Sequence, residues 1–237
     1  MLPALIYVIV LVFYPIAYNV DISLRDVTAW NIRADEHPFE GLANYVRLIT
    51  DGIFLEVLQN TFVFTLGSIL FQFAIGFAIA LYLNRAFPSR DFIRSAIILG
   101  WVLSPIVVGT IWRWMLNSDF GLLNFILRWI GVMEQNISWL PRPRTAMAGV
   151  ILANIWLGIP FNMMLLTGGL ANLPEDVYES ATIDGATRFQ KFLFITVPLL
   201  KHTIAATLML GFIYTLKVFD LIWVMTNGGP VNATTTM

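Results

Sequence analysis

Long stretches without charged residues divide this chain into apolar segments separated by polar loops. A membrane-spanning helix needs about 20 mainly apolar residues. On that criterion the pattern predicts five spans, at about 2–20, 60–83, 95–116, 145–168 and 199–223. Lys201 near the start of the last segment, and Lys217 near its end, are expected to snorkel to the membrane surface. The expected fold class is therefore all-α, a polytopic membrane helix bundle.

Composition supports the membrane assignment. The 237 residues are 58% hydrophobic and 12% charged, whereas an average soluble domain is about 45–50% apolar and about 25% charged. A water-soluble globular domain and a disordered chain are both excluded on these figures. The net charge is −1 and the basic residues are scattered, so no surface of the nucleic-acid-binding type is available. Because the chain has no cysteine, disulfides, thiolate metal sites and cysteine nucleophiles are excluded as well.

The distribution of arginine predicts the orientation. Loop 84–94 holds Arg85, Arg90 and Arg94 in eleven residues, and basic loops face the cytoplasm. Alternation then places loop 117–144 outside and loop 169–198 inside. Three arginines in loop 117–144 oppose this orientation.

Loop 117–144 contains an amphipathic segment. An apolar set with helical spacing lies on one face: Leu122, Phe125, Ile126 and Trp129. This face is expected either to pack against the protein's own helices or to meet the membrane surface or a partner.

Loop 169–198 is too long for a simple connection between helices, which usually takes 2–8 residues. Pro174 and the acidic pair after it predict a short helix from Glu175 to Ile183. Gly185 predicts a break, and Ala186 begins a second short helix. Such a bent pair, joined directly to two spans, suits a coupling element. A pair of helices lying on lipid is the alternative, although its balanced charge is not typical of one.

The residues of this loop resemble a known motif. Glu179-Ser180-Ala181-Thr182-Ile183-Asp184-Gly185-Ala186, followed by Phe192, Ile195 and Pro198, is similar to the EAA motif of permease subunits of binding-protein-dependent ABC importers. Ser180 stands where the motif has Ala, and His202 stands where relatives often have a second Pro. The segments at 39–45 and 227–236 resemble carbohydrate-type permeases, the second of them the MalF-like member of a permease pair.

The resemblance covers almost the whole chain and implies one domain, residues 1–237, of the MetI-like permease fold, with a sixth span expected beyond Met237. It implies that the EAA loop, 169–198, docks on a partner ATPase. The coupling residues carried over are Glu179, Ala181, Asp184, Gly185 and Ala186.

The resemblance also implies the partners: a second, MalG-like permease, two ATPase subunits, an extracytoplasmic solute-binding protein and membrane lipid. ATP and Mg²⁺ would bind the partner ATPase, since this chain has no Gly-rich phosphate loop and no cofactor of its own is expected. The chain itself is expected to be a transport subunit rather than an enzyme, located in a prokaryotic inner membrane.

A sugar site needs aromatic faces together with amide, hydroxyl or charged groups. The candidates on the predicted spans are Asn154, Trp156, Asn162, Tyr214, Lys217 and Asp220, with Trp101 and Ser104 as further possibilities. Hydrogen bonding between helices accounts for the internal amides equally well. Lys217 and Asp220 are three residues apart, so they are also expected to pair on one helix face.

The function expected is translocation of a sugar or oligosaccharide delivered by a binding protein. One alternative is the same architecture importing glycerol 3-phosphate or another polar solute. A second is an ion-coupled secondary transporter, which would place acids in mid-membrane, and a third is a non-transporting scaffold.

Overall fold

The computed structural model describes residues 2–28, 30–33 and 37–237, and the side chains from Leu5 onward. No strand occurs in these ranges, where the one β-type pairing is an isolated bridge between Arg25 and Phe39. An all-α fold is therefore confirmed. The chain divides into two compact units, residues 1–56 and 57–237, which are described separately.

The first unit holds a long apolar helix and a polar turn. The helix comprises α1 (Leu2–Val8), the π-helical segment η1 (Ile9–Phe13) and α2 (Tyr14–Ser23). A loop then leads to α3 (Ala43–Thr50). The amide of Asn44 on α3 donates to the carbonyl oxygens of Ser23 and Arg25, at 3.0 and 2.9 Å. These bonds fix α3 against the end of α2, which explains the Asn in the 39–45 segment.

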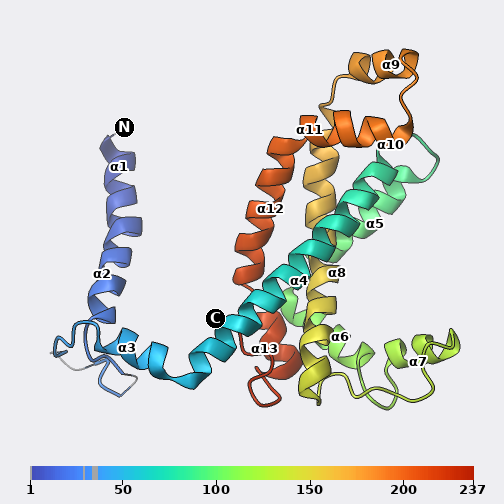
Figure 1. Ribbon diagram of the computed structural model, residues 1–237. Coiled ribbons are helices and arrows are strands. Elements are labelled where there is room, and N and C mark those ends of the chain that lie inside the picture. Colours follow the sequence, from blue (N-terminus) through green and yellow to red (C-terminus); the bar gives the residue numbers. More distant parts are fainter. Residues whose placement is uncertain (1, 29, 34–36) are drawn as a thin grey trace. The chain divides into compact units, whose positions relative to one another are not determined.

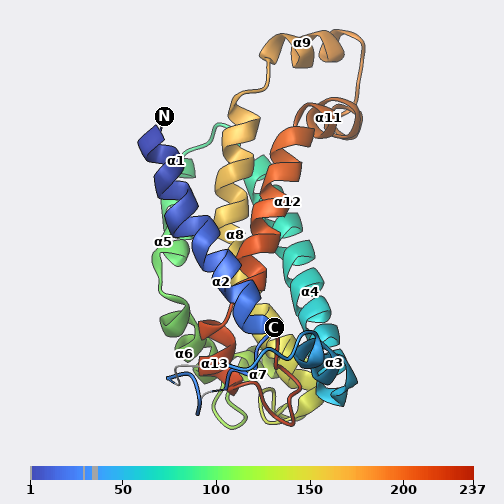
Figure 2. The same ribbon diagram turned by 90° about the vertical axis from the view of Figure 1, so that its left-hand side faces the viewer.

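The second unit is a helix bundle with its short helices gathered at two ends (Figures 1 and 2). Its long helices are α4 (Gly52–Leu83), which begins just before the unit boundary, α8 (Pro143–Ala171) and α12 (Lys201–Leu216). The other elements are α5 (Arg90–Val102), α6 (Pro105–Met115), α7 (Leu122–Trp129), α9 (Glu175–Ile183), α10 (Arg188–Lys191), η2 (Phe192–Thr196), α11 (Val197–Leu199) and α13 (Asp220–Thr226). Both views place α9 to α11 at one end, and α6, α7 and α13 at the other.

Among the described residues, three helices are long and apolar enough to cross a membrane: Leu5–Ser23, Gly52–Leu83 and Pro143–Ala171. Two bent helix pairs raise the number to as many as five. The segment that we predicted as one span at 95–116 is such a pair, because α5 and α6 meet at 100°. The break has a local cause. Ser104 is extended (ψ 139°), as the residue before a proline prefers, and Pro105 then starts α6.

The last predicted span, 199–223, is also interrupted. α12 ends at Leu216 and α13 begins at Asp220, so Lys217 and Asp220 do not share a helix. No ion pair joins them in the described part of the chain. The predicted pairing on one helix face is therefore wrong, since that spacing brings side chains together only where the helix is continuous.

Two apolar clusters hold the bundle together. One joins α4, α6, α8 and α13 around Phe64, Val150 and Leu221. The other joins α4 and α8 to the start of α12 around Met163 and Leu200. Along α4 and α8, a polar stretch lies between the two clusters, and the cavity described below opens there.

The amphipathic segment of loop 117–144 forms α7, as predicted. Its inner side is held by Asn124, whose amide donates to the carbonyl oxygen of Ile137 (2.9 Å) and accepts from the indole nitrogen of Trp139 (2.9 Å). The apolar set predicted for one face (Leu122, Phe125, Ile126 and Trp129) is exposed. Packing of this face against the protein's own helices is thus not found among the described residues.

Candidate functional site

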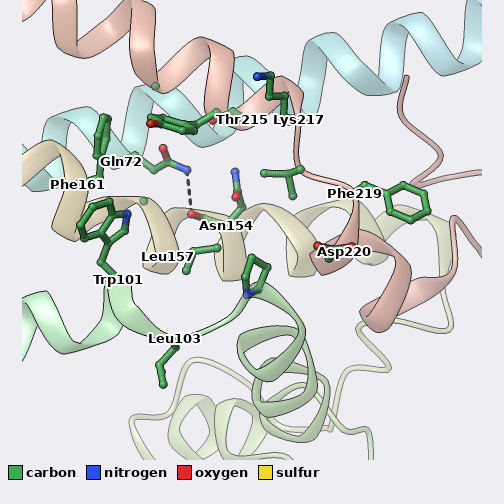
Figure 3. Close-up of a pocket in the computed structure, with 15 residues that line it drawn as sticks. Gln72, Trp101, Leu103, Asn154, Leu157, Phe161, Thr215, Lys217, Phe219 and Asp220 are labelled. Carbon is green, nitrogen blue, oxygen red and sulfur yellow. Dashed lines mark hydrogen bonds between the residues drawn. The ribbon is translucent and has the colours of Figure 1, made fainter. Parts of the chain in front are cut away.

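A cavity of about 330 Å³ opens between the two apolar clusters of the bundle (Figure 3). It is walled by side chains from α4, α5, α8 and α12 and by the link between α12 and α13. Its lining includes Gln72, Trp101, Asn154, Gly158, Phe161, Tyr214, Thr215, Lys217 and Asp220.

Two buried amides form the floor of this cavity. The Gln72 amide donates to the carbonyl oxygen of Asn154 at 2.8 Å, which ties α4 to α8. The lack of a side chain at Gly158 leaves room for the Gln72 amide, since a Cβ at position 158 would lie 2.3 Å from Cδ of Gln72. The side-chain nitrogen of Asn154 has no hydrogen-bond partner among the described residues, although Asn154 is only 3% exposed. A buried amide with a free donor is costly unless a ligand or water satisfies it.

Aromatic rings form the opposite part of the wall. The ring centroids of Trp101 and Phe161 are 6.2 Å apart, and those of Phe161 and Tyr214 are 5.1 Å apart at an interplanar angle of 81°. Aromatic rings offer large apolar faces with little loss of conformational entropy. Tyr214 lines the cavity, but it is exposed rather than interior.

Two charges of opposite sign stand at the rim. Lys217 and Asp220 both line the cavity and both are exposed, and Figure 3 shows them on separate segments of the chain. The lining therefore carries no net charge. With few polar groups in a mainly apolar wall, the cavity has the composition of a small-molecule site.

The structure brings together four of the six residues predicted for substrate contact, namely Asn154, Tyr214, Lys217 and Asp220. Trp156 and Asn162 do not line the cavity. Asn162 donates to the carbonyl oxygen of Gly158 on its own helix, so its bond is neither a cavity contact nor the bond between helices that was the alternative for the internal amides. Gln72, Phe161 and Thr215 were missed. Gln72 could have been found, because an amide in the middle of an apolar span is itself a signal.

The loop at the other end of the bundle folds as two helices with a glycine bend. α9 spans Glu175–Ile183, as predicted, whereas the second helix starts at Arg188, two residues later than predicted. Gly185 has φ +77°. The backbone N–H of Ala186 donates to Ala181 (2.9 Å) and that of Gly185 to Thr182 (3.1 Å). These two bonds form a Schellman C-cap, which requires the left-handed conformation that glycine adopts freely.

Side-chain bonds then hold the two helices against each other. The hydroxyls of Tyr178 and Thr196 share a hydrogen bond of 2.8 Å, and the Lys191 ammonium donates to the Thr182 hydroxyl at 2.6 Å. A capping box of Thr187 and Gln190 starts α10. The unit formed by α9, α10 and η2 (the lever) is therefore fixed by bonds at both of its ends.

The outer surface of the lever exposes large apolar side chains. Ile183, Phe189 and Phe194 are 86%, 71% and 70% exposed. Of the five residues predicted for coupling, Glu179, Asp184 and Gly185 are exposed, Ala186 is half-buried, and Ala181 is the buried residue of α9. Exposed apolar side chains of this size on so small a unit are typical of a protein contact surface.

Comparison with known proteins identifies the family. Residues 72–237 match the family described as "Binding-protein-dependent transport system inner membrane component". The chain belongs to this family. The resemblance inferred from the motif is thus confirmed, and the chain is a permease of the inner membrane. An ion-coupled secondary transporter and a non-transporting scaffold are set aside, since the family is one of binding-protein-dependent transport.

Relatives similar to this permease cover nearly all of it. The trehalose/maltose transport system permease protein MalF of Thermococcus litoralis is 38% identical over 237 residues, which is 100% of this chain and 78% of the relative. The sulfoquinovosyl glycerol transport system permease protein SmoG of Agrobacterium fabrum is 32% identical over 99% of this chain and 75% of its own length. A probable ABC transporter permease of Brucella suis is 34% identical over 98% of this chain and 80% of its own.

Solved structures share the fold. A chain of a bacterial ABC transporter involved in import of the acidic polysaccharide alginate has a TM-score of 0.77 and 24% identity, over 99% of this permease and 77% of that chain. A second structure is the alginate transporter in complex with an alginate pentasaccharide-bound periplasmic protein (TM-score 0.77, 26% identity, 99% and 76% covered). The expected MetI-like permease fold is therefore confirmed.

Proposed function

We propose that this permease forms the translocation path for a neutral sugar or oligosaccharide, which a solute-binding protein delivers from outside. Transport is driven by two ATPase subunits, which bind ATP and Mg²⁺, and a second, MalG-like permease completes the path. The chain itself performs no chemistry on the solute.

The observation that carries the proposal is the composition of the cavity. The rings of Trp101, Phe161 and Tyr214 offer apolar faces to the C–H faces of a sugar, and the free Asn154 donor offers a hydrogen bond to a hydroxyl. Lys217 and Asp220 balance each other in charge, which favours a neutral solute over glycerol 3-phosphate. The names of MalF and SmoG, two relatives over almost the full chain, support a sugar or glycoside as the class of solute.

The lever supports ATP-driven coupling through the EAA loop. Its bonds at Tyr178 and Lys191 make it rigid, and α8 and α11 connect it directly to the bundle. A rigid unit transmits displacement to the helices that it joins, so closure of the ATPases moves α8 and α12 and opens the cavity alternately. Exposed Ile183, Phe189 and Phe194 supply the apolar contact, and Glu179 the charged one.

The test is ATP-dependent uptake by the permease reconstituted with its partner subunits and binding protein. A panel of labelled solutes (maltose, trehalose, longer glucans and glycerol 3-phosphate) is offered to the wild type and to Phe161→Ala. We expect uptake of a neutral sugar, and a loss of up to about tenfold in the variant, because an aromatic contact is worth about 0.5–1.5 kcal/mol beyond the area that it buries. Trp114→Ala, an exposed tryptophan outside the cavity, is the control and should transport normally.

Uptake of glycerol 3-phosphate alone would contradict the choice of solute but not the transport role. Equal uptake by wild type and Phe161→Ala would show that the cavity is not on the path.

A further inference from the structure

A second and larger cleft lies beside the lever. Its volume is about 810 Å³, and it is bounded by the ends of α4 and α8, by α9, and by α10 with η2. This cleft is separate from the cavity between the apolar clusters and from the exposed apolar surface of the lever. In both ribbon views these elements lie together at the end of the bundle that carries the lever (Figures 1 and 2).

Three cations and one acid line this cleft: Arg85, Arg188 and Lys191, with Glu175. Arg188 and Lys191 lie in the single turn of α10, whereas Arg85 follows the end of α4, and in the described part of the chain none of the three forms an ion pair. Lys191 is held by its hydrogen bond to Thr182, so its ammonium group is positioned rather than mobile. The lining therefore carries an excess of two positive charges, so the cleft is electrostatically complementary to an anion.

The floor of the cleft is apolar. Leu81, Leu170 and Phe192 line it, and the Phe192 ring packs on Phe77 of α4 with centroids 5.6 Å apart. An inorganic anion would gain nothing from an apolar surface. An amphiphile with a phosphate and an acyl chain matches both the cations and the apolar residues of the cleft. The chemistry of the ligand is thus a phosphate group attached to a hydrophobic tail.

The position of the cleft agrees with this ligand. α4 and α8 are two of the three helices long and apolar enough to cross a membrane, and the cleft sits where both of them end. The ends of helices that cross a membrane lie at the level of the lipid headgroups. Basic clusters directly beyond the ends of membrane helices attract anionic lipid, by about 1 kcal/mol per Lys or Arg.

We propose that this cleft binds the headgroup of an anionic phospholipid, with the phosphate held by Arg85, Arg188 and Lys191 and an acyl chain along Leu81, Leu170 and Phe192. A lipid bound there stabilises the lever against the ends of α4 and α8. The proposal rests on the membrane location of the chain and not on the identity of the transported solute.

The test uses the assembled transporter in nanodiscs of phosphatidylcholine that contain a photoactivatable phosphatidylglycerol. Cross-linked peptides are mapped by mass spectrometry. We expect cross-links in the segments 81–85, 170–178 and 188–196, and a loss of yield of about fivefold in Arg85→Gln and again in Arg188→Gln, one step for each cation removed. Arg85→Lys keeps the charge and should keep most of the yield.

Arg90→Gln is the matched control, since Arg90 begins α5 only five residues after Arg85 but does not line the cleft. An equal loss in this variant would show general attraction to the membrane surface and overturn the proposal, as would an unchanged yield in Arg85→Gln. The melting temperature of each variant shows that it is folded. If millimolar inorganic phosphate removes the cross-link and unlabelled phosphatidylglycerol does not, the cleft is a site for free phosphate and the lipid assignment fails.

Discussion

At position 158, the absence of a side chain allows a buried amide to enter the contact between α4 and α8. A Cβ at Gly158 would lie 2.3–2.6 Å from three atoms of the Gln72 amide group. We expect Gly158→Ala to displace Gln72 and to break its bond to Asn154. Overpacking of this kind costs about 1–3 kcal/mol, which outweighs the gain of about 1 kcal/mol from replacing glycine in a helix. The measurements are the melting temperature of the purified permease complex and its rate of solute uptake.

Gly168 provides the matched control on the same helix, because a Cβ there would meet nothing within 4 Å. Gly168→Ala is expected to leave uptake unchanged and the melting temperature equal or higher. If both variants behave alike, helix propensity decides the outcome and the Gln72 contact has no role.

At position 185 the proposed coupling role depends on the backbone conformation. Gly185 has φ +77° and open space around its Cα, so a side chain would be strained by the backbone and not by a clash. We expect Gly185→Asp to cost about 1–2 kcal/mol locally, to weaken the C-cap of α9 and to abolish transport while membrane insertion persists. Uptake and the amount of inserted protein are measured together.

Gly131 has almost the same conformation, φ +74°, also in open space, but lies in the loop after α7. Gly131→Asp thus imposes similar strain at the other end of the bundle and should spare transport. Normal uptake by Gly185→Asp would remove the basis for coupling through this bend.

At the scale of elements, one of the two side-chain bonds that hold the lever together is a partly buried hydroxyl pair. Tyr178 on α9 shares a 2.8 Å hydrogen bond with Thr196, which is 5% exposed. Tyr178→Phe removes a bond worth about 1 kcal/mol. We therefore expect amide hydrogen exchange in 192–197 to become about fivefold faster, and ATP hydrolysis to proceed with less transport per ATP. Tyr82→Phe, at an exposed tyrosine with no side-chain hydrogen bond among the described residues, should change neither.

The sequence predicted well those elements whose ends are set by a local Pro or Gly. Pro174 and Gly185 set the bounds of α9, and both act through their own backbone. The break before Pro105 had the same kind of signal in the Ser-Pro step, but that signal gives neither the 100° angle nor the contacts of α6 with α13 and α8. The break at 217–219 has neither Pro nor Gly, so the apolar pattern continued across it and gave the false Lys217–Asp220 pair.

The cavity was only partly predictable for a related reason. Asn154 and Tyr214 could be chosen as polar groups in apolar spans, but their meeting with Gln72 and Phe161 depends on how four helices pack. Trp156 and Asn162 lie a few positions away on α8 and do not line the cavity. Helical phase alone does not distinguish the cavity side of α8 from its other sides, because buried amides lie on more than one of them: Asn154 lines the cavity, whereas Asn162 packs against Gly76 of α4.

At the scale of the whole molecule, the chain has no cysteine, so a single introduced cysteine can be labelled selectively at either end of the bundle. Ile183 at the tip of the lever is 86% exposed, and Ile130 after α7 is 53% exposed. We expect Ile183→Cys to react with a membrane-impermeant maleimide only when the cytoplasmic side is open, and Ile130→Cys to react from outside in intact cells. This outcome tests the orientation inferred from the arginines of loop 84–94.

The same two variants test what the lever touches. In the assembled transporter, a short bifunctional cross-linker at Ile183→Cys is expected to join the permease to an ATPase subunit, because the lever exposes apolar Ile183, Phe189 and Phe194, which is typical of a protein contact surface. Saturating ATP should change the yield, since closure of the ATPases moves the lever. Ile130→Cys should give no such product. If Ile183→Cys is labelled from the cytoplasm but never cross-links to the ATPase, the predicted orientation is supported and the proposed docking of the lever on the ATPase is contradicted.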